Sequence, residues 1–460
     1  MSLTASLYIG SSGLAINQKG IEVTGNNVSN LNTAGYSKQT LEVGTSPTLE
    51  YGGQMIGSGS TVSGISRETS VFVSRQLTAK NAEYGEESAR SLILAEIEQI
   101  IDVEDGSLST HIDEFFDAWQ ELSTDPSATL ERQQVMQTGE NLAEDFQSLV
   151  SDLASVSDSI DTDLEGKITS LNQQLQQIAD LNVQIVSAES TGISANALRD
   201  ERDLLLQEVS QLAGVSYYEE SNGMLSLQLA GGQPLVTADT VSTLSTQWNA
   251  GTLEVTLNSG ASTLTLDGDD FGGELGGMLE LRDEYIPQLV EQLDILAYNL
   301  ATAVNSVHSA GVDGDGNSGG DFFSFSSSGS EPWDGAASTL TMALTDTAQV
   351  AAGLSDEVGD NENALNLVAL QNSALVDGTS TLNAYFATIA ADVGLTVSQN
   401  STALESADDT LTQLQNMRDA VCGVSTDEEM LLLVQYQSGY EAAAKYLTAV
   451  DEMLDTLMSM

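Results

Sequence analysis

The chain has 460 residues, enough for two or three domains with hydrophobic cores of their own. It carries 68 Asp and Glu against 13 Lys and Arg, a formal net charge of −55, which excludes electrostatic binding of nucleic acid or of an anionic membrane face. Hydrophobic residues make up 41% of the chain, too many for a disordered acidic protein. No apolar run approaches the roughly 20 residues that a membrane-spanning helix needs.

The acidic surplus has three interpretations, namely a solvated secreted surface, adaptation to high salt, and specific cation binding. At about 0.15 M salt the screening length is roughly 8 Å, so neighbouring carboxylates still repel one another. We therefore predict that the melting temperature rises with NaCl. A melting temperature that stays flat or falls between low and molar NaCl would contradict this prediction.

Both ends of the chain show helical patterns with a seven-residue repeat. From Leu3 apolar or small residues recur at steps of four and three. One seam of that stripe is Leu7, Leu14, Ile21 and Val28. The corresponding carboxyl-terminal stripe is Leu433, Tyr436, Tyr440, Ala443, Leu447, Val450, Leu454 and Leu457. A spacing that averages 3.5 residues keeps one helix face toward a partner. The pattern predicts that the ends pair with each other and with further copies, or that each is an amphipathic helix on a globular core.

Between these ends the chain reads mainly as helix. Residues 37–75 alternate and predict a few short strands, and helical spacing follows over about 69–101, 109–122, 128–153 and 160–187. Asn182 lies on the apolar seam of the last of these helices. It either fixes the register of packing, as a buried polar residue does in coiled coils, or is solvent-exposed near a helix end.

The pattern changes at Gly214 from helix to strand. Alternating apolar residues with turn signals between them predict an antiparallel β unit: Leu225, Leu227, Leu229, Leu253, Val255, Leu257, Leu264 and Leu266. Helix resumes over about 277–309, and a Gly-, Ser- and Asp-rich region extends to about 338. Two further helices are expected over 361–375 and 382–417.

Signals for chemistry are weak. Residues 313–321 place Asp and Asn oxygens at alternate positions, like a calcium-binding loop, but Ser318 and Ser324 replace the glycine and the bidentate glutamate of that motif. An acidic turn is the simpler interpretation. The two histidines are far apart in sequence, and Cys422 is the only cysteine, so no disulfide within the chain is possible. The sequence therefore predicts no catalytic, cofactor-binding or metal-binding residues, and no enzyme.

A more specific string follows the first helix. Four of the seven positions from Asn26 to Asn32 are asparagine, which argues for a helix end, and Gly35 then suits a turn. The spacing of Asn26, Asn27 and Asn30 before Gly35 and Tyr36 resembles the signature of the axial proteins of the bacterial flagellum, which are the rod, hook and hook-associated proteins. A second stretch, from Gly57 to Gln76, is similar to that family's next shared element.

The carboxyl end narrows the resemblance. Gly423 to Glu429 reads Gly-Val-Ser-Thr-Asp-Glu-Glu, and is similar to the Gly-Val-x-x-Asp-Glu-Glu end of the FlgK-type hook-associated proteins. Asp427, Glu428 and Glu429 carry that match. Internal segments at Asn196–Asp203 and Gly273–Arg282 also resemble this group, so the likeness runs over nearly all of the chain.

The patterns and the resemblance together predict a mainly α fold with an inserted β-rich domain. The terminal helices pair as a coiled coil, a bundle of long helices occupies the middle, and an antiparallel β unit lies at the tip. Three domains are expected. They are a terminal helical domain (1–34 with 427–460), a mainly helical core (35–213 with 345–426), and a β-rich outer insertion (214–344). The helix over 277–309 is a candidate addition to the core.

The resemblance implies a structural subunit that forms the junction between flagellar hook and filament by self-assembly through its terminal helices. It implies as partners the chain itself, the hook protein, the second junction protein (hook-associated protein 3) and an export chaperone at the carboxyl-terminal segment, with no nucleic acid and no membrane insertion. The start of the chain lacks the features of a Sec signal. The resemblance instead implies export by the flagellar type III apparatus to the extracellular flagellum without a cleaved signal peptide.

Two alternatives stay open at this stage. The chain could be another axial protein, such as a hook or distal rod subunit. A different class is a secreted acidic adhesin or calcium-binding module.

Overall fold

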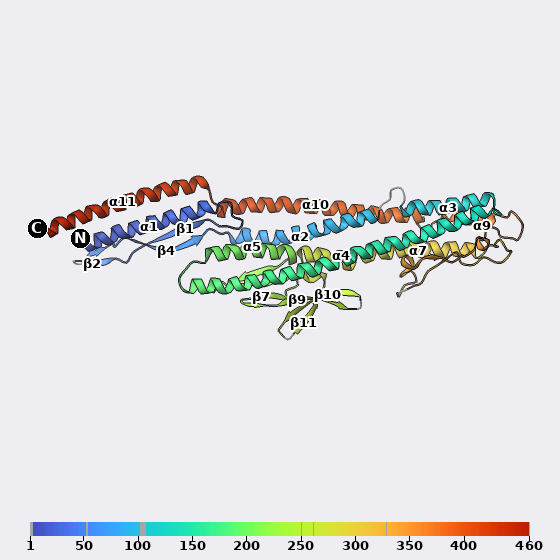
Figure 1. The fold of residues 1–460 in the computed structure, drawn as a ribbon, viewed down its shortest axis with the longest axis horizontal. Helices are drawn as coiled ribbons and strands as arrows, with labels where there is room; N and C mark the ends of the chain where they lie inside the picture. The colour runs from blue at the N-terminus through green and yellow to red at the C-terminus, as the bar shows by residue number, and fades with distance from the viewer. Residues whose placement is uncertain are drawn as a thin grey trace. The chain divides into compact units, whose positions relative to one another are not determined.

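The computed structural model describes residues 3–51, 54–101, 107–249, 251–260, 262–327 and 329–459. The chain forms two compact units. Unit 1 takes in Met1–Gly85, Ile168–Gly273 and Ser406–Met460, and unit 2 takes in Glu86–Lys167 and Glu274–Glu405. The expected mainly α fold, with paired terminal helices and several small antiparallel sheets, is confirmed (Figure 1). The division into three domains stays a prediction.

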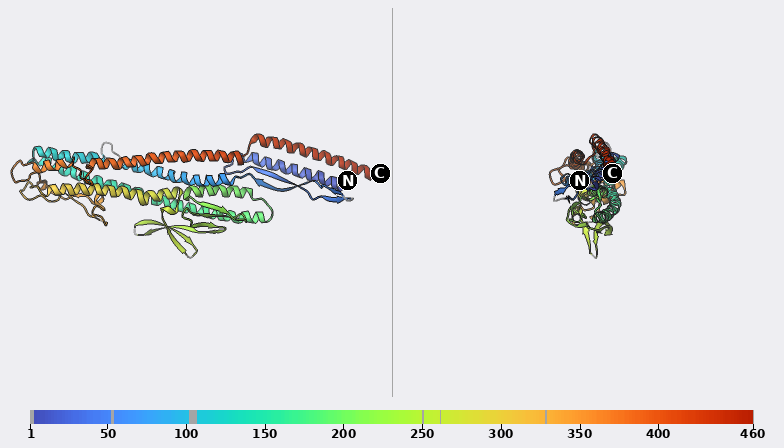
Figure 2. Two further views of the ribbon diagram at one scale, coloured as in Figure 1. Left: turned by 180° about the vertical axis from the view of Figure 1, so that it is seen from behind. Right: turned by 90° about the vertical axis from the view of Figure 1, so that its left-hand side faces the viewer.

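In unit 1 the terminal helices α1 (Leu3–Ser29) and α11 (Thr426–Met458) lie side by side, with both chain ends at the same end of the pair (Figures 1 and 2). The helices are therefore antiparallel. After α1 the chain turns at Gly35, whose φ of 78° suits glycine.

The expected short strands follow this turn. β1 (Gln39–Thr45) pairs antiparallel with β4 (Ser60–Arg67), with a bulge between Glu42 and Val43. Between them β2 (Leu49–Tyr51) pairs with β3 (Gln54–Ile56).

Four longer helices contribute residues to unit 1. They are α2 (Val71–Ile100), α4 (Thr129–Ser190), α5 (Asn196–Ala213) and α10 (Leu382–Cys422). Val73 and Leu77 near the start of α2 form a buried apolar cluster with Leu414 near the end of α10. A buried Ser210 hydroxyl donates to the carbonyl of Thr78 at 2.6 Å and joins α5 to α2.

α4 differs from the expectation of two helices over 128–153 and 160–187, because it continues without a break through residues 154–159. That segment is rich in serine, a weak helix former. Leu153, Val156 and Ile160 are nevertheless almost completely buried, so tertiary packing outweighs local preference there.

The predicted antiparallel β unit is confirmed in unit 1. One sheet has the order β5 (Ser216–Glu219), β6 (Leu225–Gln228), β7 (Pro234–Thr237), β8 (Thr240–Val241). The other has the order β11 (Ser262–Leu266), β10 (Thr252–Ser259), β9 (Thr243–Asn249). Asn172 of α4 bonds both backbone groups of Leu244, which ties the second sheet to the helix.

The side chain of Asn182 is fully buried, so the interpretation of Asn182 as a solvent-exposed residue near a helix end is wrong. Its amide donates to the carbonyls of Leu225 and Ala238 at 2.8 and 2.7 Å. Its carbonyl accepts from the Leu225 N–H and from the guanidinium of the buried Arg202, both at 3.0 Å. Asn182 therefore sets where the first sheet docks on α4.

Unit 2 contains most of the remaining elements. They are α3 (Leu108–Thr124), α6 (Gly273–Glu280), the π-helical turn η2 (Leu281–Tyr285), α7 (Ile286–His308), β12 (Phe323–Ser324), α8 (Ala336–Thr339), β13 (Thr341–Met342), the 3₁₀ turn η3 (Thr347–Gln349) and α9 (Glu362–Leu370). A further 3₁₀ turn, η1 (Gly268–Asp270), precedes α6 in unit 1. The expected helix over 277–309 is present as α6, η2 and α7 in succession.

The core of unit 2 is an aromatic cluster of Phe115, Trp119, Phe322 and Phe323, whose rings meet mostly edge to face. His308 packs against Trp119 and Phe322 and is fully buried. Its Nδ1 lies 2.7 Å from the Gly320 carbonyl, and its Nε2 accepts the N–H of Ala351 at 3.0 Å. This arrangement requires a neutral ring protonated on Nδ1.

We predict that unit 2 loses stability when the pH falls below about 6.5, the ordinary pKa of histidine. Burial lowers the pKa of His308, although the Gly320 carbonyl and the nearby Asp321 and Asp313 act in the opposite direction. Between the lowered pKa and 6.5 only the unfolded chain binds the proton, so stability is lost as the pH falls, by up to about 1.4 kcal/mol per pH unit. Melting curves from pH 7.5 to 5.5 should show this slope. An equal slope in His308→Gln would contradict the assignment.

Candidate assembly surface

α1 and α11 meet along a row of small residues. Gly20 faces Tyr436, and a β-carbon at position 20 would lie 2.5 Å from ring carbon Cδ1 of that tyrosine. Gly10 faces Leu447, where a β-carbon would lie 2.7 Å from Cδ2. Both separations are shorter than van der Waals contact, so a side chain at either position would force the helices apart. The glycines let bulky residues of α11 reach the α1 backbone.

The packing is reciprocal. Gly439 of α11 lies against the side chain of Asn17, which leaves no room for a β-carbon there. Asn17 Nδ2 donates to the Gly13 carbonyl at 2.7 Å. Ala443 is the neighbour of Gly13, at 3.5 Å from the position of its absent β-carbon. The contact thus runs in register from Gly10 and Leu447 at one end to Gly20 and Tyr436 at the other.

The residues predicted as assembly contacts fall into two groups. Nine are buried or half-buried, and Tyr436, Ala443 and Leu447 among them face α1; the nine are Leu7, Leu14, Ile21, Leu433, Tyr436, Ala443, Leu447, Val450 and Leu454. Val28, Tyr440 and Leu457 are exposed. The position of Val28 has a geometric reason, since a strict seven-residue repeat drifts by about 20° per heptad on a straight helix.

α11 also has exposed large apolar side chains, most of which lie off the stripe that faces α1. Leu431, Val434, Met453 and Leu457 are each more than 45% exposed, and so is Tyr8 on α1. Isolated exposed apolar residues are ordinary, but a helix with apolar side chains on its inner and outer sides is typical of one that has further packing partners.

The asparagine and Gly-Tyr motif at the end of α1 meets the Asp-Glu-Glu motif at the start of α11. Asn27 Nδ2 donates to Glu429 Oε2 at 3.0 Å and to the Gln39 carbonyl at 2.9 Å. Its Oδ1 accepts from the Gln39 N–H at 3.0 Å and from the Tyr36 hydroxyl at 2.8 Å. Asn27 and Glu429 are buried. We call Asn27, Tyr36, Lys38, Arg418 and Glu429 the polar collar.

The two cations of the collar hold the connection between α1 and β1 in place: Lys38 in the connection binds α11, and Arg418 binds the connection from α10. Lys38 Nζ pairs with Glu428 at 2.8 Å and Glu429 at 3.6 Å. The hydrogen bond to Glu428 raises the pKa of Lys38 and lowers that of Glu428. Arg418 at the end of α10 donates to the Gly35 carbonyl at 2.7 Å. Burial raises the pKa of Tyr36 to about 12, and the carboxylates of Asp200 and Glu429 act in the same direction.

Asp200 of α5 extends this network to the strands. Its carboxylate accepts from the Ser37 N–H at 3.1 Å and from Arg67 at 2.8 Å. Arg67 also bonds Asp203 at 2.7 Å. The collar is therefore fixed to α5 as well as to α11.

The remaining motif residues lie around the collar. Asn26 is exposed and donates to the Tyr36 hydroxyl at 3.2 Å, and Asn30 donates to the Asn26 carbonyl at 3.0 Å. Gly35 packs against Leu204. Asp427, with Glu428 and Glu429, occupies the first turn of α11, where negative charge stabilises the helix dipole.

The geometry gives little support for metal binding, catalysis or membrane insertion. The described residues hold no group of three or more His, Cys, Asp or Glu side chains placed to bind a metal ion. In the calcium-like loop Asp313 Oδ1 instead accepts the N–H groups of Asp315 and Asn317. His111 pairs with Asp145, and His308 belongs to the aromatic core. Within the described residues no helix is both long and apolar enough to cross a bilayer.

Comparison with known proteins decides the family. Residues 94–323, half of the chain, match the family described as the flagellar hook-associated protein FlgK helical domain. The chain belongs to the FlgK family. The two ends match broader families: residues 7–36 the flagella basal body rod protein family, and residues 422–460 the carboxyl-terminal family of the basal body rod proteins FlgEFG.

Full-length relatives agree with the FlgK assignment. Flagellar hook-associated protein 1 of Bacillus subtilis is 27% identical, with 97% of this chain and 96% of that protein covered. The protein of the same name from Escherichia coli is 25% identical, with 98% of each covered. The solved structure of the flagellar hook junction protein FlgK from Burkholderia pseudomallei has the same fold, with a TM-score of 0.69 at 19% identity, and covers 75% of this chain and all of that one.

A FlgK-family chain is a structural subunit of the flagellum, acting at the junction of hook and filament. The match of the helical domain separates this chain from the hook and rod proteins, which the ends alone cannot do. Sequence patterns did not identify the roles of Gly20, Arg418 and Asp200. The only sequence signal for them was the glycine spacing of α1 and the occurrence of Asp200 in a family-like segment.

Proposed function

We propose that this FlgK-family chain builds the hook–filament junction by self-assembly through α1 and α11. The observation that carries the proposal is the antiparallel α1–α11 pair, which is closely packed on one side and exposes Leu431, Val434 and Met453 on the other. Repetition of one head-to-tail contact between copies produces an open helical array or a ring, depending on whether the rotation closes.

Physical chemistry supports an assembly role for the ends. Most of the stability of a helix in a protein comes from packing of its apolar face, so each terminal helix is expected to need a partner. α1 and α11 supply one another with a first partner, and the exposed apolar side chains of α11 need a second. A net charge of −55 then keeps free copies soluble by mutual repulsion.

The proposed partners beyond the chain itself are the hook protein, the second junction protein and an export chaperone that covers the carboxyl-terminal segment. The proposed route is export by the flagellar type III apparatus to the extracellular flagellum without a cleaved signal peptide. Family membership and the exposed apolar surface of α11 support these assignments. We propose no catalytic activity and no cofactor.

The test is Leu447→Asp. A carboxylate at this position would be placed against the Gly10 backbone in the helix contact, and we expect loss of incorporation and a non-motile cell. Quantities of the chain in purified flagella and swimming on soft agar measure the effect. Thr448→Asp is the matched control, because Thr448 is exposed on the same helix. Normal motility in Leu447→Asp would refute the proposed role of the helix pair.

A further inference from the structure

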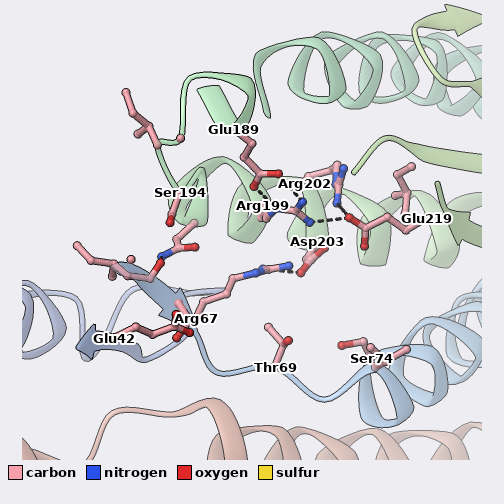
Figure 3. Close-up of a pocket in the computed structure, with 18 of the residues that line it drawn as sticks. Glu42, Arg67, Thr69, Ser74, Glu189, Ser194, Arg199, Arg202, Asp203 and Glu219 are labelled. Carbon is pink, nitrogen blue, oxygen red and sulfur yellow. Dashed lines mark hydrogen bonds and ion pairs between the residues drawn. The ribbon is translucent and has the colours of Figure 1, made fainter. Parts of the chain in front are cut away.

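Unit 1 contains a pocket of about 580 Å³ that the helix pair does not use. It opens between the end of β4, the start of α2, the connection from α4 to α5, and β5 (Figure 3). Ser194 lies on one side and Thr69 and Ser74 on the other, with a row of charged side chains between them (Figure 3).

That charged row is internally paired. Arg199 bonds Glu189 at 2.7 Å and Glu219 at 2.6 Å. Arg202 lies 3.5 Å from the same Glu219 oxygen. Arg67 uses its guanidinium on Asp200 and Asp203, as described above. These cations stabilise the pocket and leave no free positive charge for a ligand.

Arg75 is different. It lines the same pocket from α2, and its side chain is exposed. Within the described residues no carboxylate forms a salt bridge with its guanidinium, whose charge acts on Tyr217 of the same pocket and opposes the rise in the pKa of that tyrosine that burial causes. The chain holds 68 acidic residues against 13 basic ones, so most of its arginines lie beside a carboxylate. An unpaired arginine next to a pocket is therefore unusual here, and its five donors suit a carboxylate from outside.

The pocket lining also includes exposed apolar side chains. Val71 and Ile193 line the pocket and are 63% and 64% exposed, and the adjacent Phe72 is 65% exposed. Isolated exposed apolar residues need no explanation, but two that line one pocket beside an exposed arginine, with Phe72 next to one of them in sequence, match the composition of protein interfaces. Such interfaces are enriched in aromatic residues and arginine.

We infer that this pocket is a docking site for an acidic segment with apolar side chains from a second copy of this chain. The inference rests on the proposed self-assembly and names one of its surfaces. Charge complementarity selects the occupant: the surface of another copy is overwhelmingly acidic, and Arg75 is the group that turns this repulsion into local attraction. The exposed apolar side chains of the pocket supply the remaining contact area.

Photo-crosslinking in assembled flagella identifies the occupant. The full chain carrying p-benzoylphenylalanine in place of Ser194, which lines the pocket and is exposed, keeps Arg75 intact and should form a covalent dimer of this chain on irradiation. Mass spectrometry should place the second attachment in a peptide with Asp or Glu beside apolar residues. Crosslinks only to another flagellar protein, or none in flagella that contain the chain, would overturn the inference.

Substitutions in the pocket measure how much Arg75 and Ile193 contribute to incorporation of the chain into flagella. Arg75→Glu and, independently, Ile193→Asp should reduce incorporation at least tenfold. Lys80→Glu should stay within twofold, because Lys80 lies on the same helix and pairs with its neighbour Glu83 outside the pocket. Circular dichroism checks that each variant folds, and both altered side chains are exposed. Since salt screens charge, the Arg75→Glu deficit should shrink at 1 M NaCl.

The two proposals fail separately. If Arg75→Glu and Ile193→Asp incorporate normally while Leu447→Asp does not, the pocket is no docking site and the helix pair keeps its role. If Leu447→Asp incorporates normally, the proposed self-assembly through α1 and α11 fails first.

Discussion

Gly20→Leu should separate α1 from α11 and abolish incorporation of the chain into flagella. A β-carbon alone would overlap the Tyr436 ring, and a leucine adds three further carbons to the same space. Overpacking in a close contact costs about 1–3 kcal/mol or more. Because the overlap is with the Tyr436 ring, the helices can relieve it only by moving apart along this contact. Soft-agar motility and the amount of chain in purified flagella measure the result.

Gly25→Ala is the control, since Gly25 lies on the same helix and a β-carbon there meets no atom within 4 Å. Alanine in a helix interior is favoured over glycine by about 0.5–1 kcal/mol, so this variant should assemble at least as well as the unchanged chain. Equal motility of Gly20→Leu and Gly25→Ala would show that the Gly20–Tyr436 contact is dispensable.

Asn182→Leu should lower the free energy of unfolding by about 3–5 kcal/mol. The substitution removes the acceptor of the Leu225 N–H and one of the acceptors of the buried Arg202, which keeps the Gly223 carbonyl, and a buried N–H left without a partner is costly. It also removes the donor to Leu225 and Ala238, so the first sheet loses its attachment to α4. Urea denaturation followed by circular dichroism gives the difference.

Asn172→Leu provides the comparison, because Asn172 makes the same pair of bonds to Leu244 but is only half-buried. Water can replace its lost bonds, and we expect a loss of only about 1 kcal/mol. If both variants lose the same amount, burial of Asn182 is not what makes its bonds valuable.

Periodicity was enough to predict the two terminal helices and that they pair. It does not contain the register, because the repeat shows which face of a helix is apolar and says nothing about which residue lies opposite. Gly10 and Asn17 were visible as interruptions of the α1 stripe. Leu447 packs against Gly10, and Gly439 makes room for Asn17. Only the tertiary structure shows these pairings.

The polar collar was beyond sequence reasoning for a related physical reason. Asn27 and Glu429 are about 400 residues apart, and each looks like an ordinary helix-end residue by itself. Their burial together makes them significant, since a buried carboxylate is costly unless it is paired, and Asn27 and Lys38 supply the hydrogen bond and the charge. Family resemblance selected these residues, and the structure supplied the reason for their chemistry.

In α4 the sequence-based prediction of two helices failed because tertiary packing outweighs local helix preference. Local preference suggested an end near residue 154, where serines are frequent. Leu153, Val156 and Ile160 are buried, and that burial contributes more than helix propensity, which differs by only a few tenths of a kcal/mol per residue.

The position of the polar collar has a mechanical consequence. A pull on α1 along its axis reaches the rest of unit 1 through Asn27, Ser37 and Arg67, whose bonds to Glu429 and Asp200 would be loaded together. These hydrogen bonds to carboxylates would share the load. A flexible peptide connection, in contrast, extends before it bears force. The turn between α1 and β1 is therefore a stiff coupling, and weakening Asp200 should make the subunit yield under strain before it makes the subunit unfold.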